Sequence, residues 1–324
     1  MKQIVLEAPG KFAEREAPLP AVPPGCALVR MERVGVCGSD FHAFAGTHPI
    51  YTYPRVLGHE LSGVIIECPS NDKGLRPGDR CAIEPYLTCG HCRACRKNRR
   101  NCCENIQLFG IHIDGGLQEF LTVPLDLLHK SDQLSLEQLA LVETLGIGAH
   151  AVERSCLHYK DSVLVVGAGP VGLATTLFAG LSAAAIHVVE TNPERRRFVE
   201  AMGYRATESA DGRQADVVFD ATGSSEAMAS SLRLVAPAGR LVFVGLTKNP
   251  IQIDDSVLHR GEITVLASRN SFGMFPYIIQ LIERGIIDPA HWVTAHLAMA
   301  EVSSKFSTLP AKPQIVKAMI DVSH

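Results

Sequence analysis

The chain has 324 residues, of which 46% are hydrophobic, and its formal net charge is -3 at pH 7. That length exceeds one ordinary hydrophobic core, so we expect a soluble globular protein of two domains. The charge leaves no basic surplus for nucleic acid, and the N-terminal residues contain no apolar run of signal-peptide length. Ten cysteines without such a signal are typical of a reducing compartment, so we expect a cytoplasmic location.

Residues 162–189 carry no Asp, Glu, Lys or Arg, and this stretch is long enough to cross a membrane. It contains GAGPVG near its start, however, and has the pattern of strand, tight turn, helix and strand. A buried parallel-sheet unit is uncharged in the same way. We therefore expect no membrane span.

Residues 1 to about 80 show short apolar runs broken by turn signals such as APLPAVPPG and RPGDR. Strands are expected at residues 4–6, 27–30 and 62–66. The pattern predicts an irregular β domain without a helix.

One loop-rich segment of this domain, residues 36–60, gathers side chains that bind metals. Cys37, His59 and a carboxylate such as Glu60 would suit a catalytic zinc ion, which keeps one coordination position open. On residue types alone, a buried cysteine and a hydrogen-bonded core histidine remain the alternative.

A second cysteine group follows in CGHCRACRKNRRNCC. Cys89, Cys92 and Cys95 are spaced to wrap one tetrahedral zinc ion, with Cys103 or Cys102 as the fourth ligand. The alternative, exposed thiols, is disfavoured because clustered surface cysteines oxidise. The arginines in this loop are interpreted as a solvated rim, since no aromatic residue lies among them.

Glu143 lies within a helical pattern at residues 134–152, among apolar neighbours. A carboxylate is costly to bury unless it is paired or bound to a metal, which makes it a further candidate ligand. A position on the helix surface is the alternative.

The motif Gly167-Ala-Gly169-Pro170-Val171-Gly172 follows a predicted strand at 163–166 and opens a helix. Glu190 ends the next strand. This context predicts a dinucleotide site: Gly167 allows the turn, Gly169 lets the backbone approach the pyrophosphate, and Gly172 permits close helix packing.

Cofactor choice follows from the acid of this motif. Glu190 should accept hydrogen bonds from the adenosine ribose and repel a 2′-phosphate, which favours NAD over NADP. Three neighbouring arginines weaken this prediction because one of them could hold the phosphate: Arg195, Arg196 and Arg197.

Further strands at 215–220, 239–245 and 263–268 alternate with helices such as 226–234, which predicts a doubly wound parallel sheet. Cofactor should lie at the carboxyl ends of these strands, near Thr222, Gly223, Gly245 and Ser268. The tail, with a helix at 275–284 and strands near 296 and 315, should complete the first domain. The expected domains are 1–148 with 270–324, and 149–269.

The motifs VCGSDFH, GHE, CGHCRAC and VGAGPVG, in this order and spacing, resemble the zinc-dependent medium-chain alcohol dehydrogenase superfamily over essentially the whole chain. GSD, GHE and Glu143 are similar to sorbitol, threonine and related polyol or sugar-acid dehydrogenases. YPRVLGHE, GIHIDGG, and SRN followed by FP are similar to the bacterial galactonate and gulonate 5-dehydrogenases. The resemblance implies an α/β protein with an irregular β, GroES-like catalytic domain and a Rossmann domain.

The resemblance also implies two zinc ions per chain. Cys37 and His59 would bind the catalytic ion, and Glu60 or Glu143 would supply the third protein ligand, directly or through water. Thr144 stands where relatives commonly have Pro, which makes the role of Glu143 less certain. The structural ion would be bound by Cys89, Cys92, Cys95 and Cys103, since the family spacing selects Cys103 over Cys102.

Other roles are implied in the same way. Ser39 matches the hydroxyl that passes the substrate proton outward, and His42 matches a relay group. Arg269 and Asn270 fall at the substrate and nicotinamide end of the cleft, where Arg269 would contact either a substrate carboxylate or the cofactor.

The expected function is zinc-dependent transfer of hydride from a secondary alcohol of a sugar acid or polyol to NAD. A threonine- or neutral-polyol dehydrogenase is one alternative, and a non-catalytic zinc and nucleotide binder is another. A small-molecule substrate and a homodimer or homotetramer are the expected partners, without nucleic acid or membrane.

Overall fold

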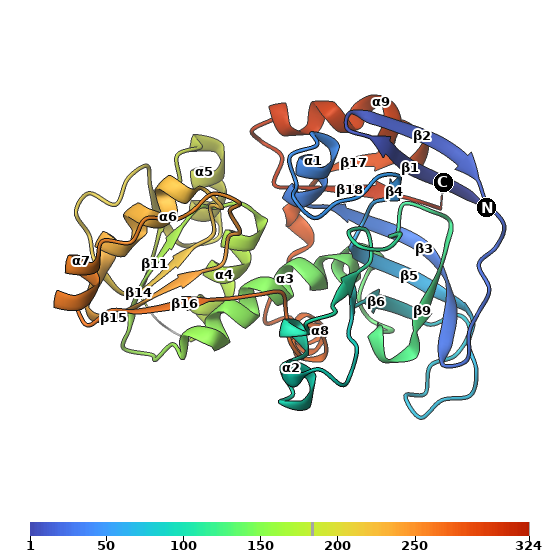
Figure 1. Ribbon diagram of the computed structural model, residues 1–324, viewed down its shortest axis with the longest axis horizontal. Helices are drawn as coiled ribbons and strands as arrows, with labels where there is room; N and C mark the ends of the chain where they lie inside the picture. Colours follow the sequence, from blue (N-terminus) through green and yellow to red (C-terminus); the bar gives the residue numbers. More distant parts are fainter. Residues whose placement is uncertain (183–184, 324) are drawn as a thin grey trace. The chain divides into compact units, whose positions relative to one another are not determined.

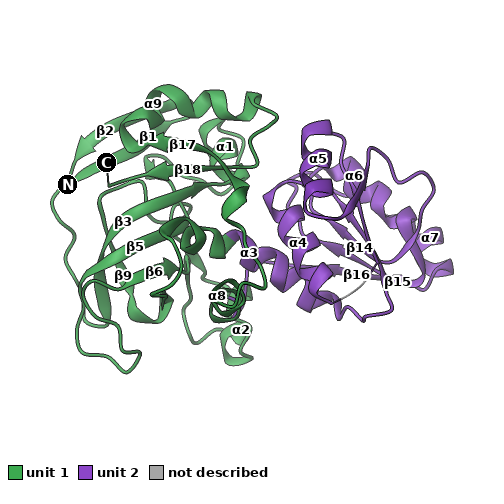
Figure 2. Cartoon of the chain, turned by 180° about the vertical axis from the view of Figure 1, so that it is seen from behind, with its two compact units in different colours: residues 1–143, 275–324 green, residues 144–274 purple. Residues whose placement is uncertain are grey.

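The computed structural model (Figure 1) describes residues 1–182 and 185–323, and the chain forms two compact units (Figure 2). Unit 1 comprises Met1–Glu143 and Phe275–His324, and unit 2 comprises Thr144–Met274. These boundaries fall a few residues from those expected from the sequence. Residues 183 and 184 of the uncharged stretch, and residue 324 of the expected catalytic domain, lie outside the described residues.

Unit 1 is built on a mixed sheet with the strand order β10-β6-β5-β3-β18-β17, and β9 also pairs with β3. All of these pairs are antiparallel except β17 with β18. The strands are β3 (Cys26–Val36), β5 (Glu60–Glu67), β6 (Arg80–Ile83), β9 (Phe120–Pro124), β10 (Leu128–Lys130), β17 (Val293–Ala298) and β18 (Lys317–Asp321).

Smaller elements complete this unit. Two further sheets consist of β1 (Lys2–Ala8), β2 (Lys11–Glu16) and β4 (Arg55–Val56), and of β7 (Tyr86–Leu87) and β8 (Gln107–Leu108). Its helices are α1 (Gly38–Phe44), α2 (Arg93–Arg96), α8 (Phe275–Glu283) and α9 (Val302–Lys305), with 3-10 turns at Arg100–Cys102, Leu125–Leu127, Ala290–Trp292, Met299–Glu301 and Phe306–Ala311.

The main hydrophobic core of unit 1 joins strands that are far apart in the sequence. Leu6 of β1, Val29 of β3, Ile65 of β5 and Ile320 of β18 are buried in it. Each such side chain stabilises the fold by about 1.5–3 kcal/mol relative to exposure. The C-terminal segment therefore belongs to the core of unit 1, and its last strand, expected near residue 315, begins at Lys317.

The register of three adjacent strands places distant residues side by side. Gly35 of β3 lies opposite Glu60 of β5 on one side and opposite Met319 of β18 on the other. An added Cβ at Gly35 would lie only 2.1 Å from Oε2 of Glu60. Lys317 shares the face of Met319, because side chains alternate along a strand. The glycine thus leaves the space in which Glu60 and Lys317 meet.

Helix α1 contradicts the expectation that the first 80 residues lack a helix. Its start is capped by Asp40, whose Oδ2 accepts a hydrogen bond of 2.9 Å from the Cys37 backbone N–H. Gly46, at a φ of +71°, follows its end. The helix was missed because it is short and begins with Gly-Ser-Asp, a sequence that also favours turns.

Unit 2 contains a parallel sheet in the order β13-β12-β11-β14-β15-β16, which is the order of a Rossmann fold. The strands are β11 (Ser162–Val166), β12 (Ala185–Val189), β13 (Arg205–Thr207), β14 (Ala215–Asp220), β15 (Val235–Phe243) and β16 (Thr264–Ala267). The connecting helices in Figure 1 are α4 (Pro170–Leu181), α5 (Pro193–Ala201), α6 (Ser225–Ser231) with the 3-10 turn Leu232–Leu234, and α7 (Asp255–Arg260).

Helix α3 (Leu136–Ser155) contains the boundary between the two units. The sheets of the two units agree with the predicted fold class of an irregular β domain and a Rossmann domain. Within the described part of the chain, no helix has the length and apolar character needed to cross a membrane.

Candidate functional site

The structure brings three predicted metal ligands together in unit 1. Cys37 ends the connection from β3 to α1, His59 precedes β5, and Glu60 begins that strand. One donor atom from each of these residues lies within 4.8 Å of the other two. His59 and Glu60 are buried, and Cys37 is half-buried. Thiolate, imidazole and carboxylate in this arrangement fit a zinc ion.

Asp40 lies beside His59. Oδ1 of Asp40 lies 3.7 Å from Nδ1 of His59, and both side chains are buried. Burial alone would lower the pKa of His59, but the charges of Asp40 and Cys37 raise it well above its usual value. The acidic neighbours therefore favour positive charge in this region, either as a proton on the imidazole or as a bound cation, and a metal ligated by His59 would displace that proton. Asp40 belongs to the motif VCGSDFH and had not been assigned a role.

Glu60 is bound on both oxygens by a residue that the sequence analysis missed. Nζ of Lys317 lies 2.6 Å from Oε1 and 2.7 Å from Oε2, and it also donates to the carbonyl oxygen of Val36. Both charged side chains are only 1% exposed. Burial opposes the charge on Lys317, but the carboxylate of Glu60 outweighs it and raises the pKa of the ammonium group. A metal would have to compete with this ammonium group for Glu60.

Glu143 lies on α3 and is also buried, so the alternative of a surface position is wrong. Its Oε1 accepts a hydrogen bond of 2.5 Å from the hydroxyl of Tyr86, another residue that was missed. Burial raises the pKa of Glu143, while the nearby charge of His59 acts in the opposite direction. Among the described residues, the group within 4.8 Å contains Glu60 and not Glu143. Glu60 is thus the carboxylate that groups with Cys37 and His59, and its charge is already neutralised by Lys317.

The two predicted proton-carrying residues lie on α1. Oγ of Ser39 is 3.5 Å from Nε2 of His59. His42 is exposed, and its Nδ1 lies 3.2 Å from Oγ1 of Thr47. Ser39 and His42 are three residues apart and therefore lie on the same side of the helix, with Ser39 at the ligand cluster and His42 in solvent.

The second cysteine group forms a compact cluster around α2. The Sγ atoms of Cys89, Cys92, Cys95 and Cys103 lie within 4.8 Å of one another. Backbone N–H groups point at them: that of Cys89 donates to Cys103, that of Cys92 to Cys89 and that of Cys95 to Cys92.

These thiols fit a tetrahedral zinc ion. A hydrogen bond from the backbone of His91 lowers the pKa of Cys89 to about 6, which favours the thiolate. Cys102 is exposed and outside the cluster, and the arginines of this loop are also exposed. The structure thus places Cys103, rather than Cys102, with the other three.

The glycine motif has the geometry of a pyrophosphate cradle. Gly167 has a φ of +94°, and an added Cβ at Gly169 would meet nothing within 4 Å. At Gly172 an added Cβ would lie 1.9 Å from the carbonyl oxygen of Gly167. Pro170 and Val171 form the first turn of α4, whose N-terminus carries the positive end of the helix dipole. These residues fit a dinucleotide.

Glu190 is fixed at the end of β12. Its Oε2 accepts from the backbone N–H of Ala168 at 2.7 Å, and its Oε1 accepts from that of Asn192 at 2.8 Å. The glycine turn and the acid are therefore one hydrogen-bonded unit.

The neighbouring arginines differ in their contacts. Arg196 donates to the carbonyl oxygens of Glu190 and Thr191, and Arg197 pairs with Glu194. Nε of Arg195 is buried and has no hydrogen-bond partner among the described residues. Arg195 is therefore the arginine of the three best placed to take a further ligand.

The carboxyl ends of the sheet gather the remaining predicted residues. Asp220 accepts two hydrogen bonds from Thr222, and Gly223 and Gly245 are in close contact, since a Cβ at Gly245 would lie 2.4 Å from the nitrogen of Gly223. Arg269 is exposed after β16.

Three polar atoms after β16 are buried without a hydrogen-bond partner in the described part of the chain: Oγ of Ser268, Nδ2 of Asn270 and Oγ of Ser271. Buried polar groups are normally paired, so these atoms indicate a polar ligand. Ser271 had not been predicted. It follows Asn270 directly, and only its position after the strand could have signalled it.

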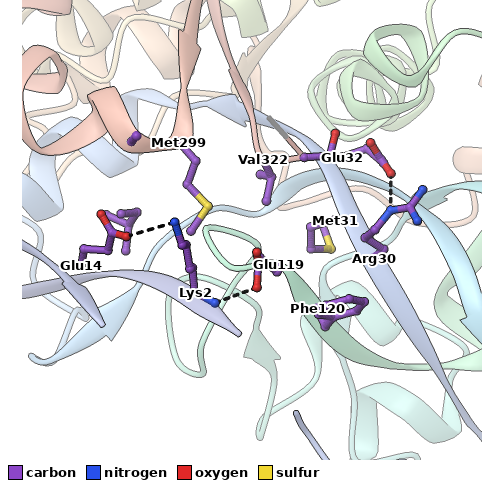
Figure 3. A pocket seen from close by; sticks show the side chains of 12 residues that line it. Lys2, Glu14, Arg30, Met31, Glu32, Glu119, Phe120, Met299 and Val322 are labelled. Carbon is purple, nitrogen blue, oxygen red and sulfur yellow. Dashed lines mark hydrogen bonds and ion pairs between the residues drawn. The ribbon is translucent and has the colours of Figure 1, made fainter. Parts of the chain in front are cut away.

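A cavity of about 600 Å³ lies elsewhere on unit 1 and contains none of these ligands (Figure 3). Its charged side chains pair with one another: Lys2 with Glu14, and Arg30 with Glu32. Glu119 also accepts from the backbone N–H of Lys2. We therefore assign the chemistry to the metal and nucleotide residues rather than to this cavity.

Replacement of Cys103 by Ser should lower the zinc content of the purified protein by about one ion per chain and lower its Tm, because the thiolate cluster would lose a ligand. Cys102→Ser is the matched control, and it should change neither quantity. Zinc is measured by elemental analysis and Tm by calorimetry. Equal zinc loss in both variants would contradict the assignment.

Replacement of Lys317 by Met should destabilise the protein by about 3–5 kcal/mol, because it leaves the carboxylate of Glu60 buried without its partner. The double variant Lys317→Met/Glu60→Gln should recover part of that loss. Lys305→Met, in an exposed pair with Glu301, should cost at most about 1 kcal/mol. Denaturant unfolding measures all three. A double variant as unstable as the single one would show that the loss does not come from the uncompensated carboxylate of Glu60.

Comparisons with known protein families agree with both the metal-binding domain and the nucleotide-binding domain. Residues 23–133 match the alcohol dehydrogenase GroES-like domain, and residues 170–284 match the zinc-binding dehydrogenase family. The chain is 36% identical to the L-galactonate-5-dehydrogenase of Escherichia coli K12 over 284 residues, which covers 84% of each chain.

Solved structures show the same fold. An alcohol dehydrogenase (rspB) from E. coli CFT073 complexed with NADH has a TM-score of 0.93 at 27% identity, and a zinc-binding dehydrogenase from Sinorhizobium meliloti 1021 bound to NADP has 0.92 at 27%. Each comparison covers 99% of both chains. These matches identify an alcohol or polyol oxidoreductase that uses zinc and a nicotinamide cofactor. The chain belongs to the zinc-dependent medium-chain alcohol dehydrogenase superfamily.

Proposed function

We propose that this enzyme oxidises a secondary alcohol of a sugar acid or polyol to the ketone, with NAD as the hydride acceptor. The observation that carries the proposal is the cluster of Cys37, His59 and Glu60 beside the hydroxyl of Ser39. The similarity of the chain to an L-galactonate-5-dehydrogenase supports a sugar acid as the substrate class.

The chain's own residues would prepare the reaction. Cys37 and His59 supply two metal ligands, and Glu60 or Glu143 supplies a third. When bound, zinc acts as a Lewis acid that lowers the pKa of the substrate alcohol, and the nicotinamide ring accepts hydride. In the metal-bound enzyme the carboxylate of Asp40, which lies 3.7 Å from Nδ1 of His59, would orient the imidazole, as carboxylates beside metal-binding histidines do.

Ser39 and His42 provide a route for the released proton. The hydroxyl of Ser39 lies at the ligand cluster, where it can accept a proton from the alcohol while donating its own. His42 lies one turn along α1 in contact with solvent and can take up the proton there. The two side chains would therefore pass the proton from the half-buried Ser39 to the exposed His42.

Glu190 supports NAD rather than NADP. Its carboxylate is held by the glycine turn, where it can accept hydrogen bonds from the adenosine ribose and repel a 2′-phosphate. Arg196 and Arg197 are engaged by other groups, which leaves Arg195 as the candidate for phosphate binding in a variant that lacks the acid. Arg269, after β16, is our candidate for binding a substrate carboxylate.

Purified enzyme of known zinc content should produce NADH, followed by absorbance, from aldonates in a panel that also contains neutral polyols, threonine and simple alcohols. Turnover of neutral polyols or threonine alone would retain the chemistry and reject the sugar-acid substrate. If no compound is oxidised although both zinc sites are filled, the proposal is wrong.

Cys37→Ser and His59→Ala should reduce turnover to background, because each removes a ligand that the alcohol-activating metal needs. Both variants should still bind NADH, as measured by its fluorescence, because the nucleotide residues lie in unit 2. If either variant kept its activity, the replaced residue would not be a ligand of the catalytic metal.

Glu190→Ala should raise the ratio of kcat/KM for NADP to that for NAD by at least about tenfold, because the charge that repels the 2′-phosphate is lost. Glu200→Ala, which removes an exposed acid near the C-terminal end of α5, is the control and should leave the ratio unchanged. An unchanged ratio in Glu190→Ala would show that this acid does not select the cofactor.

A further inference from the structure

The connection between α1 and β4 carries an aromatic pair at the candidate metal site. The rings of His48 and Tyr51 meet edge to face, with centroids 4.7 Å apart and an interplanar angle of 76°. Tyr51 is 7% exposed and packs in the main hydrophobic core of unit 1. The position of its side chain is therefore set by unit 1 itself.

Both members of the pair carry a polar atom that the protein leaves unpaired. The hydroxyl of Tyr51 and Nδ1 of His48 are buried, and neither makes a hydrogen bond of normal geometry with the described residues, although the hydroxyl of Ser39 is near enough to act on the pKa of the Tyr51 phenol. Tyr53, two residues later, shows the usual arrangement, since its hydroxyl donates to the carbonyl oxygen of Ala43 at 2.5 Å. Buried hydroxyl and imidazole groups are nearly always paired, so a partner from outside the chain is expected.

The pair lies near enough to the ligand cluster for the charges of its residues to act on both groups. Tyr51 is next to Ser39, whose Oγ is 3.5 Å from Nε2 of His59. Burial raises the pKa of the Tyr51 phenol, and the charges of Asp40 and Cys37 raise it further. Burial lowers the pKa of His48, and the neighbouring His42 and His59 act in the same direction. Tyr51 therefore stays a neutral hydroxyl, and His48 tends to the neutral imidazole.

We propose that Tyr51 and His48 together bind a second hydroxyl group of the substrate, adjacent to the alcohol that is oxidised. This inference rests on the proposed function. A phenol and a neutral imidazole can each donate or accept, so the pair matches a hydroxyl, which does both. A monohydric alcohol would leave the two buried groups unpaired, and the site would thus select vicinal diols, as found in polyols and sugar acids.

The test compares two substrates that differ in one hydroxyl, 2,3-butanediol and 2-butanol, in the zinc-loaded enzyme. The wild type should prefer the diol in kcat/KM. Tyr51→Phe keeps the ring and removes the hydroxyl, so it should lower kcat/KM for the diol at least about tenfold and change that for 2-butanol little. His48→Phe should shift the preference in the same direction. Tyr277→Phe, at an exposed tyrosine of α8, is the control.

The outcomes separate this inference from the proposed function. If the wild type oxidises neither alcohol, no aldonate and no neutral polyol, the proposed function fails and this inference fails with it. If the wild type is active but does not prefer the diol, or if Tyr51→Phe keeps the preference or loses both activities equally, the inference alone is overturned. Zinc content and Tm, measured for each variant, show whether an equal loss comes from a damaged metal site.

Discussion

The buried ion pair between Lys317 and Glu60 is the interaction on which the candidate metal site depends. It exists because two strands from opposite ends of the chain flank β3, and because Gly35 leaves space between them. The ammonium group also donates to the carbonyl oxygen of Val36, the residue before Cys37. One side chain therefore fixes a carboxylate and the backbone at the start of the ligand loop.

Charge explains why such a pair is useful beside a metal. Cys37, Asp40, Glu60 and Glu143 bring four acidic groups to one buried region, and each carboxylate held without a partner would be costly there. Lys317 cancels the charge of Glu60, and the hydroxyl of Tyr86 stabilises that of Glu143. The two candidate third ligands thus differ in kind: one is compensated by a cation and the other by a neutral donor.

Motifs that are local in the sequence were predictable, because their function needs residues at fixed short spacing. The four cysteines around α2 and the turn from Gly167 to Gly172 are of this type, and their geometry agrees with the spacing. Lys317 and Tyr86 were not predictable. Lys317 meets a residue 257 positions away, and no pattern around it distinguishes a buried lysine from a surface one.

The same reasoning accounts for the other differences. Helix α1 was missed because Gly-Ser-Asp is compatible with either a turn or the start of a helix. The hydrogen bond from the backbone of Cys37 to Asp40 stabilises the helix start. Whether Glu143 was buried could not be read from periodicity, since a helix through a domain boundary has no single polar face. The buried polar atoms of Ser268 and Asn270 that lack a hydrogen-bond partner in the described part of the chain could not be predicted either. Which polar atoms the protein leaves without a hydrogen bond is known only once the fold is known.

The insertion of β18 between β3 and β17 has a consequence for biosynthesis. A ribosome releases residues 1–143 and then the whole of unit 2 before it makes the strand that carries Lys317. During that interval the edge of β3 that later pairs with β18 is unpaired and Glu60 lacks the ammonium group of Lys317, so the nascent first domain is incomplete while the nucleotide domain can already fold. The carboxylate of the candidate metal site therefore gains the ammonium group of Lys317 only after the nucleotide domain has been synthesised.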